Sequence, residues 1–224
     1  LGSRSTAIGQ GTLATQNFTT ATNSQNTAVG YFAGNAVTTG QYNTLTGSGA
    51  GDALTTGSEN VAIGYGTLTT DDVGSRSTAV GTTALANQNT ATAANIYNTA
   101  VGYAAGNAVT TGIQNTLIGG LAGDALTVGG TNVALGVSAL GADTQGSSSV
   151  AIGSSALRLQ NFTTATDVYN VAIGRAAGEN VTTGIHNTLI GGLAADALTD
   201  ADFNVAVGYS ALSSDTLGSR STAI

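Results

Sequence analysis

Side chains that could carry out catalysis are few in this chain. It contains one histidine, His186, together with five arginines, twelve acidic residues and no cysteine. A Ser/His/Asp arrangement would need that histidine beside a nucleophile and an acid. Asp71 and Asp72 are adjacent carboxylates, and a carboxylate pair can act as general acid and general base. These are the two candidates for an enzyme site.

An internal repeat tests both candidates. The sequence repeats itself with a period of 72 residues, so a residue that does chemistry in every repeat should return at that spacing. His186 corresponds to Gln114 and Tyr42, and Asp72 corresponds to Thr144. Because neither candidate recurs, we expect His186 to be a surface residue, and we expect no enzyme activity and no cofactor.

Two columns of aspartates do keep the period of the repeat. They are Asp52, Asp124 and Asp196, and Asp71, Asp143 and Asp215. A turn stabilised by each carboxylate is the favoured interpretation. Calcium held between repeats is the alternative, but it needs about six oxygen ligands and the local sequence offers one or two acids. We therefore expect no metal site. Arg4, Arg76 and Arg220 share a third column and could pair with the nearby Asp71 or Asp215 in weak surface contacts.

The composition excludes several classes of function. The net charge is -7, and the arginines are scattered, so no basic stripe is available for nucleic acid. No apolar run approaches the length of a membrane helix, so we expect no membrane insertion in this segment. No basic and apolar leader is present, so any export signal is expected to lie outside this window.

A five-residue string sets the spacing of all these residues. It reads Asn or Ser, Thr or Val, Ala or Leu, an aliphatic residue and Gly, and its thirteen copies follow one another at steps of 21, 17, 17 and 17 residues. The closing glycines are Gly9, Gly30, Gly47, Gly64, Gly81, Gly102, Gly119, Gly136, Gly153, Gly174, Gly191 and Gly208. Frequent Gly, Thr and Val disfavour helix. One string per turn predicts an all-β fold, a parallel β-solenoid (β-roll) of 17- and 21-residue coils in a 72-residue super-repeat.

The repeat also predicts the domain organisation. We expect one continuous solenoid over residues 1–224, with super-repeats at 1–72, 73–144 and 145–216 and a partial copy at 217–224. Because residues 217–224 repeat the first eight residues, we expect the chain to be a segment of a longer fibre. A 17-residue coil is long enough for two short strands and two turns.

Alternation along an extended chain assigns the two faces of each string. In residues 60–64, Val61 and Ile63 share one face, which we expect to be buried because such residues favour a packed, pleated surface. Ala62 lies on the opposite face, where a small side chain lets another backbone approach. A single thin coil buries little, so we expect three chains to pack alanine face to alanine face as a homotrimer.

Asparagine is the first residue of nine strings, and two interpretations remain open. Stacked asparagines could form a structural ladder of side-chain hydrogen bonds along the fibre, or each could serve its own turn or cap. The nine are Asn26, Asn43, Asn60, Asn98, Asn115, Asn132, Asn170, Asn187 and Asn204.

The four extra residues of each 21-residue step predict a loop. Extra residues in a solenoid must leave the stack on one face, and such loops often carry binding. Gln16, Gln88 and Gln160 are expected to begin the loop tips. The candidate binding residues are Asn17, Phe18, Asn89, Tyr97, Asn161, Phe162 and Tyr169. A receptor site, a bulge without function and a lateral contact between chains all remain open. Tyrosines that follow string glycines are expected to pack at coil corners, namely Tyr31, Tyr65, Tyr103 and Tyr209.

The strings themselves resemble those of a known family. Ser149-Val-Ala-Ile-Gly153 and Asn170-Val-Ala-Ile-Gly174 resemble the head repeats of trimeric autotransporter adhesins. The longer pattern from Asn98 to Gly119 also resembles repeats of phage tail-fibre and other virion structural proteins. This resemblance implies a left-handed parallel β-roll, assembled as an extracellular or virion-borne homotrimeric fibre with an attachment role.

We therefore predict a non-enzymatic structural or adhesive fibre segment, located outside the cell, on a cell surface or on a virion. It would project or display a surface that binds a host glycan or protein receptor, with no nucleic acid as partner. Two alternatives remain open. One is a self-assembling extracellular filament whose subunits stack end to end, and the other is a monomeric solenoid that binds ice or polysaccharide through a flat threonine array.

Overall fold

The computed structural model describes residues 2–224, and Leu1 lies outside the described residues. All regular structure in that range is β-strand, and the contacts divide the chain into two compact units, Leu1–Thr111 and Gly112–Ile224. The first unit contains β1 (Gly2–Ser3), β2 (Thr6–Ile8), β3 (Thr22–Asn23), β4 (Thr27–Val29), β5 (Thr44–Thr46), β6 (Val61–Ile63), β7 (Thr78–Val80) and β8 (Thr99–Val101). The second contains β9 (Thr116–Ile118), β10 (Val133–Leu135), β11 (Gly146–Ser147), β12 (Val150–Ile152), β13 (Thr166–Asp167), β14 (Val171–Ile173), β15 (Thr188–Ile190), β16 (Val205–Val207) and β17 (Thr222–Ala223).

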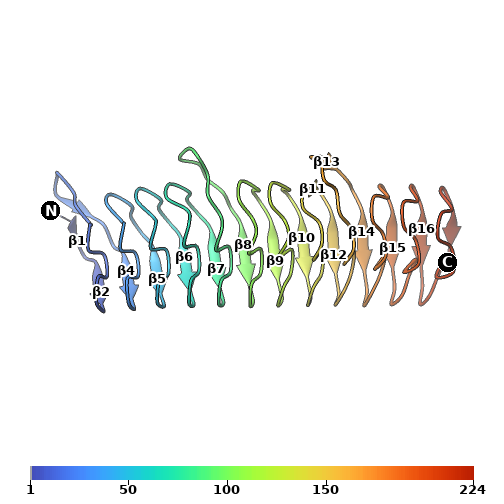
Figure 1. Cartoon of the computed structure of the whole chain (residues 1–224), viewed down its shortest axis with the longest axis horizontal. Helices are drawn as coiled ribbons and strands as arrows, with labels where there is room; N and C mark the ends of the chain where they lie inside the picture. The colour runs from blue at the N-terminus through green and yellow to red at the C-terminus, as the bar shows by residue number, and fades with distance from the viewer. Residues whose placement is uncertain (1) are drawn as a thin grey trace. The chain divides into compact units, whose positions relative to one another are not determined.

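Each string forms one short strand, and successive strands pair in parallel. In the first unit the order is β2-β4-β5-β6-β7-β8, and in the second it is β9-β10-β12-β14-β15-β16-β17. The register places equal string positions opposite each other, so that Val61 pairs with Thr44 on one side and with Thr78 on the other. The strands β4 to β8 lie side by side in Figure 1. The prediction of an all-β parallel solenoid with one coil per string is confirmed.

The buried and exposed faces of the strands are the reverse of those predicted from the sequence. Ala62 and Leu45, at the middle of their strings, are fully buried, whereas Val61 is half-buried and Ile63 is 38% exposed. Leucines such as Leu68 fill the coil interior from the opposite wall, so beside the asparagine of the string there is room for only a small or single aliphatic side chain such as Ala62 or Leu45. The expected contact between alanine faces of three chains is therefore wrong, because these faces line the interior of each coil.

The second wall of each coil consists of turns, which differs from the expected second strand. Leucines on this wall adopt left-handed backbone conformations, with φ of 51° at Leu68, 54° at Leu140 and 49° at Leu157. A positive φ interrupts an extended chain, so these leucines do not belong to any of the strands of residues 2–224. The same leucines still plug the core, since all three side chains are fully buried.

The glycine that closes each string is required by both conformation and space. Gly64 has φ of +136°, and a Cβ atom built there would lie 2.7 Å from the carbonyl oxygen of Gly81 in the next coil. L-residues rarely adopt this conformation. The closing glycines thus allow successive coils to stack at strand spacing where the chain leaves the strand.

In the 21-residue coils the chain forms an additional short pairing where it returns from the loop. Strand β3 pairs with β1, and β13 pairs with β11. In the coil between β7 and β8 a single bridge joins Ser75 to Asn95. Residues 91–95 are exposed, and their loop extends beyond the neighbouring coils in Figure 1.

Candidate functional site

The asparagine column joins successive coils within each unit. The Oδ1 atom of Asn60 accepts a hydrogen bond from the main-chain N–H of Ser77 in the next coil at 2.9 Å, and its own N–H donates to Oδ1 of Asn43 at 3.0 Å. Its Nδ2 donates to the carbonyl of Gly74 at 2.9 Å, across the same coil. The Asn60 side chain therefore links its coil to the next and also closes its own turn.

The same geometry is found along most of the column. Hydrogen bonds from Nδ2 to a carbonyl fourteen residues later occur at Asn26, Asn43, Asn60, Asn115, Asn132, Asn170 and Asn187. All nine asparagines of the predicted ladder are fully buried. Most contacts between coils run from side chain to main chain, while Nδ2 of Asn204 also donates to Oδ1 of Asn187 at 3.1 Å.

A buried polar network replaces asparagine where the string begins with serine. The Nε2 atom of Gln88 donates to Oδ2 of Asp71 at 2.5 Å and to Oγ of Ser77 at 3.0 Å. Its Oε1 accepts from Nδ2 of Asn98 at 3.0 Å. Oδ1 of Asp71 accepts the N–H of Gly74 at 2.9 Å, which is the turn role expected for this aspartate column.

The second unit repeats this network at the same spacing. Nε2 of Gln160 donates to Asp143 at 2.6 Å and to Ser149 at 3.0 Å, and its Oε1 accepts from Asn170 at 2.9 Å. Gln88 and Gln160 are fully buried, so the expectation that they begin an exposed loop tip is wrong. The sequence carried a signal for their role, because each glutamine stands eleven residues after the serine that replaces asparagine.

The structure separates the seven candidate loop residues into three environments. Phe18 and Phe162 are 5% and 7% exposed, so their rings pack inside the coil and cannot contact a receptor. Tyr97 and Tyr169 are about half exposed and lie just before a string, outside the loop. Asn17 and Asn89 are exposed, whereas Asn161 is half-buried and accepts a hydrogen bond from Thr144 at 3.0 Å.

The residues just before the strings form an exposed row of side chains. In the first unit, Arg76 pairs with Glu59 at 3.1 Å and donates to the hydroxyl of Tyr97 at 2.9 Å. The expected pairing of the arginine column with Asp71 is therefore wrong for Arg76. Glu59 has this role because it precedes the neighbouring string, whereas Asp71 points into the coil.

In the second unit the same row is a stack of rings. His186 lies between Tyr169 and Phe203, with ring centroids 5.4 and 4.9 Å away and interplanar angles of 15° and 9°. The guanidinium of Arg220 lies 5.8 Å from the centre of the Phe203 ring. The histidine is exposed, as expected, and its imidazole has aromatic neighbours rather than a nucleophile.

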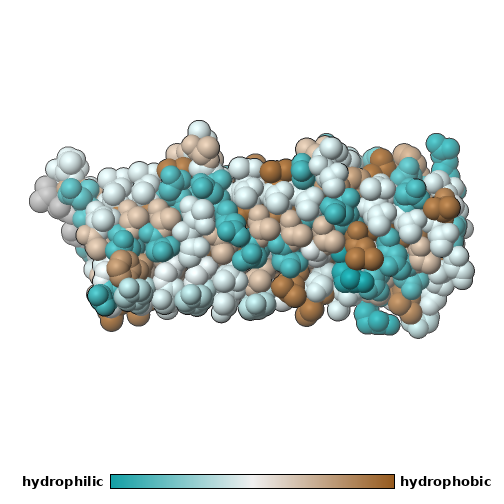
Figure 2. Space-filling model, viewed as in Figure 1, coloured by the Kyte–Doolittle hydropathy of each residue, from teal (hydrophilic) through white to brown (hydrophobic). Residues whose placement is uncertain are grey.

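The outer face of the strands carries a row of aliphatic side chains at the fourth position of each string. In the first unit Ile8 is 60% exposed, and in the second Leu135 is 41% exposed and Ile173 37%. Twelve of the thirteen strings have Val, Ile or Leu at this position. Isolated apolar side chains interrupt an otherwise hydrophilic or neutral surface in Figure 2.

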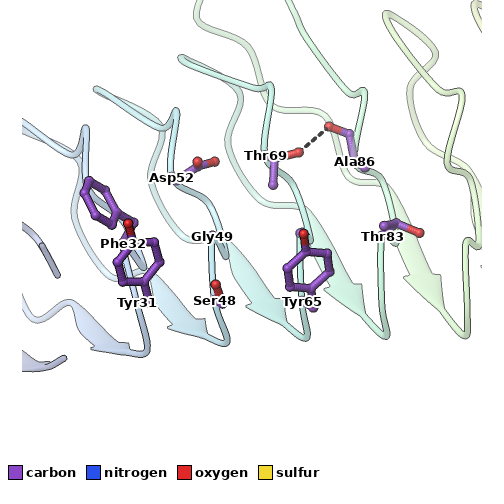
Figure 3. A pocket seen from close by; sticks show the side chains of 10 residues that line it. Tyr31, Phe32, Ser48, Gly49, Asp52, Tyr65, Thr69, Thr83 and Ala86 are labelled. Atoms are coloured by element: carbon purple, nitrogen blue, oxygen red, sulfur yellow. Dashed lines mark hydrogen bonds between the residues drawn. The ribbon is translucent and has the colours of Figure 1, made fainter. Parts of the chain in front are cut away.

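A groove of about 500 Å³ lies over the turns that follow strands β4 to β7 in the first unit. Tyr31 and Tyr65 stand on either side of Ser48 and Gly49, with Asp52 further along the coil (Figure 3). The two tyrosine side chains are 56% and 65% exposed, so the expectation that they pack at coil corners is wrong.

The carboxylate of Asp52 is partly desolvated at the edge of this groove. Its Oδ1 atom is buried and has no hydrogen-bond partner among the described residues. Burial raises the pKa of Asp52 above its ordinary value, although main-chain hydrogen bonds at Asp52 and Ala53 oppose the shift. Burial likewise raises the pKa of Asp124 in the equivalent coil of the second unit.

Metal-binding clusters and membrane-spanning helices are absent from residues 2–224. That range contains no cluster of three or more His, Asp or Glu side chains placed to hold a metal ion. It also contains no helix long and apolar enough to cross a membrane.

Comparisons of the chain with protein-family models, with curated proteins and with solved structures find no match.

Proposed function

We propose that this chain is a non-enzymatic segment of an extracellular fibre, carried by a cell surface or a virion, that works as a homotrimer and displays a receptor-binding surface. The observation that carries this proposal is the aliphatic row on the outer face of the strands. Val, Ile or Leu occupies this outward position in twelve of the thirteen strings. A repeated exposed apolar position of this kind is typical of a surface that contacts another molecule.

The energetics of this row support self-association. Burying an aliphatic side chain completely contributes about 1.5–3 kcal/mol. Ile173 and Ile190 are each 37% exposed, so covering the remaining surface contributes roughly 0.5–1 kcal/mol per side chain. A second copy of the chain is the occupant that fits best, because it presents a row with the same strand-to-strand spacing. The alanine faces cannot take this role, since they line the coil interior.

The buried hydrogen bonds supply the stiffness that a fibre needs. Within each unit successive coils are joined by the strand ladder, and the strings that begin with asparagine add side-chain hydrogen bonds to the next coil. Bending or melting one coil would expose main-chain groups such as the N–H of Ser77, which is held by Asn60 at 2.9 Å. Unpaired buried groups of this kind are costly, so the coils resist local opening.

Light scattering over a range of concentrations tests the proposal. We expect a mass of about three times the 21.7 kDa of one chain. Ile173→Lys places a charge in the aliphatic row and should lower this mass. Thr183→Lys adds the same charge at an exposed position of the same coil and should leave it unchanged. A monomer at all concentrations, or equal behaviour of the two variants, would refute trimer formation through this face.

A second candidate function follows from the threonines of the outer face. In the first unit Thr44, Thr78 and Thr99 are half-buried and point outward at the second position of their strings. Such an array would suit a monomer that binds an ordered surface such as ice or crystalline polysaccharide. A monomeric mass combined with inhibition of ice growth would favour this function over the trimer.

A further inference from the structure

The groove of the first unit has the composition of a site for a neutral saccharide. It combines two exposed aromatic rings, Tyr31 and Tyr65, with the carboxylate of Asp52 and the hydroxyl groups of Ser48 and Thr69. Aromatic rings pack against flat apolar surfaces, and sugar rings present such surfaces through their C–H groups. A carboxylate accepts strong hydrogen bonds from hydroxyl groups.

Other ligand classes fit this groove less well. No basic side chain lines it, so an anion would meet only the negative charge of Asp52. A divalent cation such as calcium needs about six oxygen ligands, and Asp52 is the only acid in the lining. A purely apolar ligand would leave this carboxylate without a partner, which is costly.

The backbone fixes the distance between the two tyrosines. The N–H of Gly49 donates to the carbonyl of Tyr31 at 2.9 Å, and the N–H of Gly66 donates to the carbonyl of Ser48 at 3.0 Å. Tyr31 and Tyr65 are therefore two coils apart, which corresponds to roughly 9.6 Å at about 4.8 Å per coil. This spacing is comparable with the length of a disaccharide in an extended β-1,4-linked chain, so two sugars of one chain could each stack on a ring.

Glycine at position 49 keeps the groove open. A Cβ atom built there would meet only Oδ2 of Asp52, at 3.9 Å, so a larger side chain would cover the carboxylate. The two later repeats have Leu121 and Leu193 at this position, with φ of 59° and 58°, close to the 67° of Gly49. The hollow around Leu121 is smaller, about 230 Å³.

We propose that Tyr31, Tyr65 and Asp52 form a binding site for a β-1,4-linked oligosaccharide, with Ser48 and Gly49 as its floor. This site rests on the proposed function, because it would be the receptor-binding surface that the fibre displays. It lies on the turns after the strands, so the aliphatic row remains available for contacts between chains.

Calorimetric titration of the intact chain with cellotetraose and with chitotetraose tests the site. We expect at least one probe to bind with a Kd of about 1 mM or tighter, and the two probes distinguish a glucose chain from an N-acetylglucosamine chain. Gly49→Leu should weaken binding at least tenfold without unfolding the chain, because leucine already occupies the equivalent positions. Tyr65→Val should weaken it about tenfold, the effect of losing one ring contact of roughly 1.4 kcal/mol.

The control is Tyr209→Val, which removes an exposed tyrosine at the same position after a string but outside the groove. It should leave binding unchanged, and circular dichroism should show native folding for all three variants. Failure of both probes to bind more tightly than about 10 mM, or undiminished binding by Gly49→Leu, would overturn the proposal. Light scattering on the same samples separates the two ideas: a monomer that binds the sugar refutes the trimer alone, and a trimer that does not bind refutes the groove alone.

Discussion

Replacing Asn60 by alanine tests whether the buried asparagine column stabilises the coils. The variant leaves the N–H of Ser77 and the carbonyl of Gly74 without their partners, which now lie at 2.9 Å each. Both contacts are buried, and an unsatisfied buried group costs about 1–3 kcal/mol. Two such groups give an expected loss of roughly 2–6 kcal/mol in the free energy of unfolding.

Urea denaturation followed by circular dichroism measures this loss. Asn60→Leu serves as a second variant, because it fills the space but restores neither hydrogen bond, and it should destabilise the chain nearly as much. Thr56→Ala, at an exposed position of the preceding coil, should change the free energy of unfolding by no more than about 0.5 kcal/mol. A loss below about 1 kcal/mol for Asn60→Ala would contradict a stabilising role of these hydrogen bonds, and recovery of stability by leucine would show that packing is the role of this column.

Three further predictions concern backbone strain and charge. Gly64→Ala should lower the thermal midpoint of unfolding, because φ is +136° and the new Cβ would lie 2.7 Å from the carbonyl oxygen of Gly81. Gly120→Ala is the control and should leave the midpoint unchanged, because a Cβ there has nothing within 4 Å. Similar midpoints for the two variants would contradict the steric argument. Thr131→Asn should raise the free energy of unfolding by up to about 1 kcal/mol in urea denaturation, because Thr131 has φ of 57° and asparagine tolerates this conformation better. Asp52→Asn should stabilise the chain at neutral pH, because burial raises the pKa of Asp52 and so penalises the ionised folded state. This gain should disappear as the pH falls below the ordinary value of 3.8, where aspartate is protonated in both states; a gain that is independent of pH would contradict it.

Much of the fold could be predicted from spacing alone. The string recurs at intervals that fit one turn of chain, and its closing glycine has the conformation and the close contact that such a turn requires. Leu68 and Leu140 each stand four residues after a closing glycine, and both fill the interior from the opposite wall and are fully buried. Both roles proposed for the asparagines occur together, since Asn60 contacts the next coil and also closes its own turn.

The facing of the strands could not be predicted from alternation. A period of two identifies two faces but does not tell which one is inside. The β-branched and aliphatic character of Val61 and Ile63 suggested burial, yet Ala62 is the buried residue. The interior already receives a leucine from the other wall and an asparagine from the string, so it has room for little more. The volume left in the interior therefore determines which face of the strand is buried, and a pattern of residue types does not report that volume.

The groove could not be predicted because its residues come from different coils. Tyr31, Gly49 and Tyr65 follow three consecutive strings and have separate places in the repeat. Only the structure shows that they border one hollow. The sequence contains one indication of the groove, which is the glycine at position 49, because the later repeats have Leu121 and Leu193 there.

In the 21-residue coils a glutamine replaces the hydrogen bonds that asparagine makes in the other coils. The side chain of Ser77 is too short to reach across the coil as Asn60 does, and Gln88 from the longer coil occupies the vacant place. Asp71 holds the same amide, which explains why serine, glutamine and aspartate recur together in the second unit. The extension is therefore anchored by a buried network before residues 91–95 leave the coil. Because a loop with a fixed base loses less conformational entropy on binding than a free one, this anchoring would favour the proposed display of exposed residues such as Asn89 to a receptor.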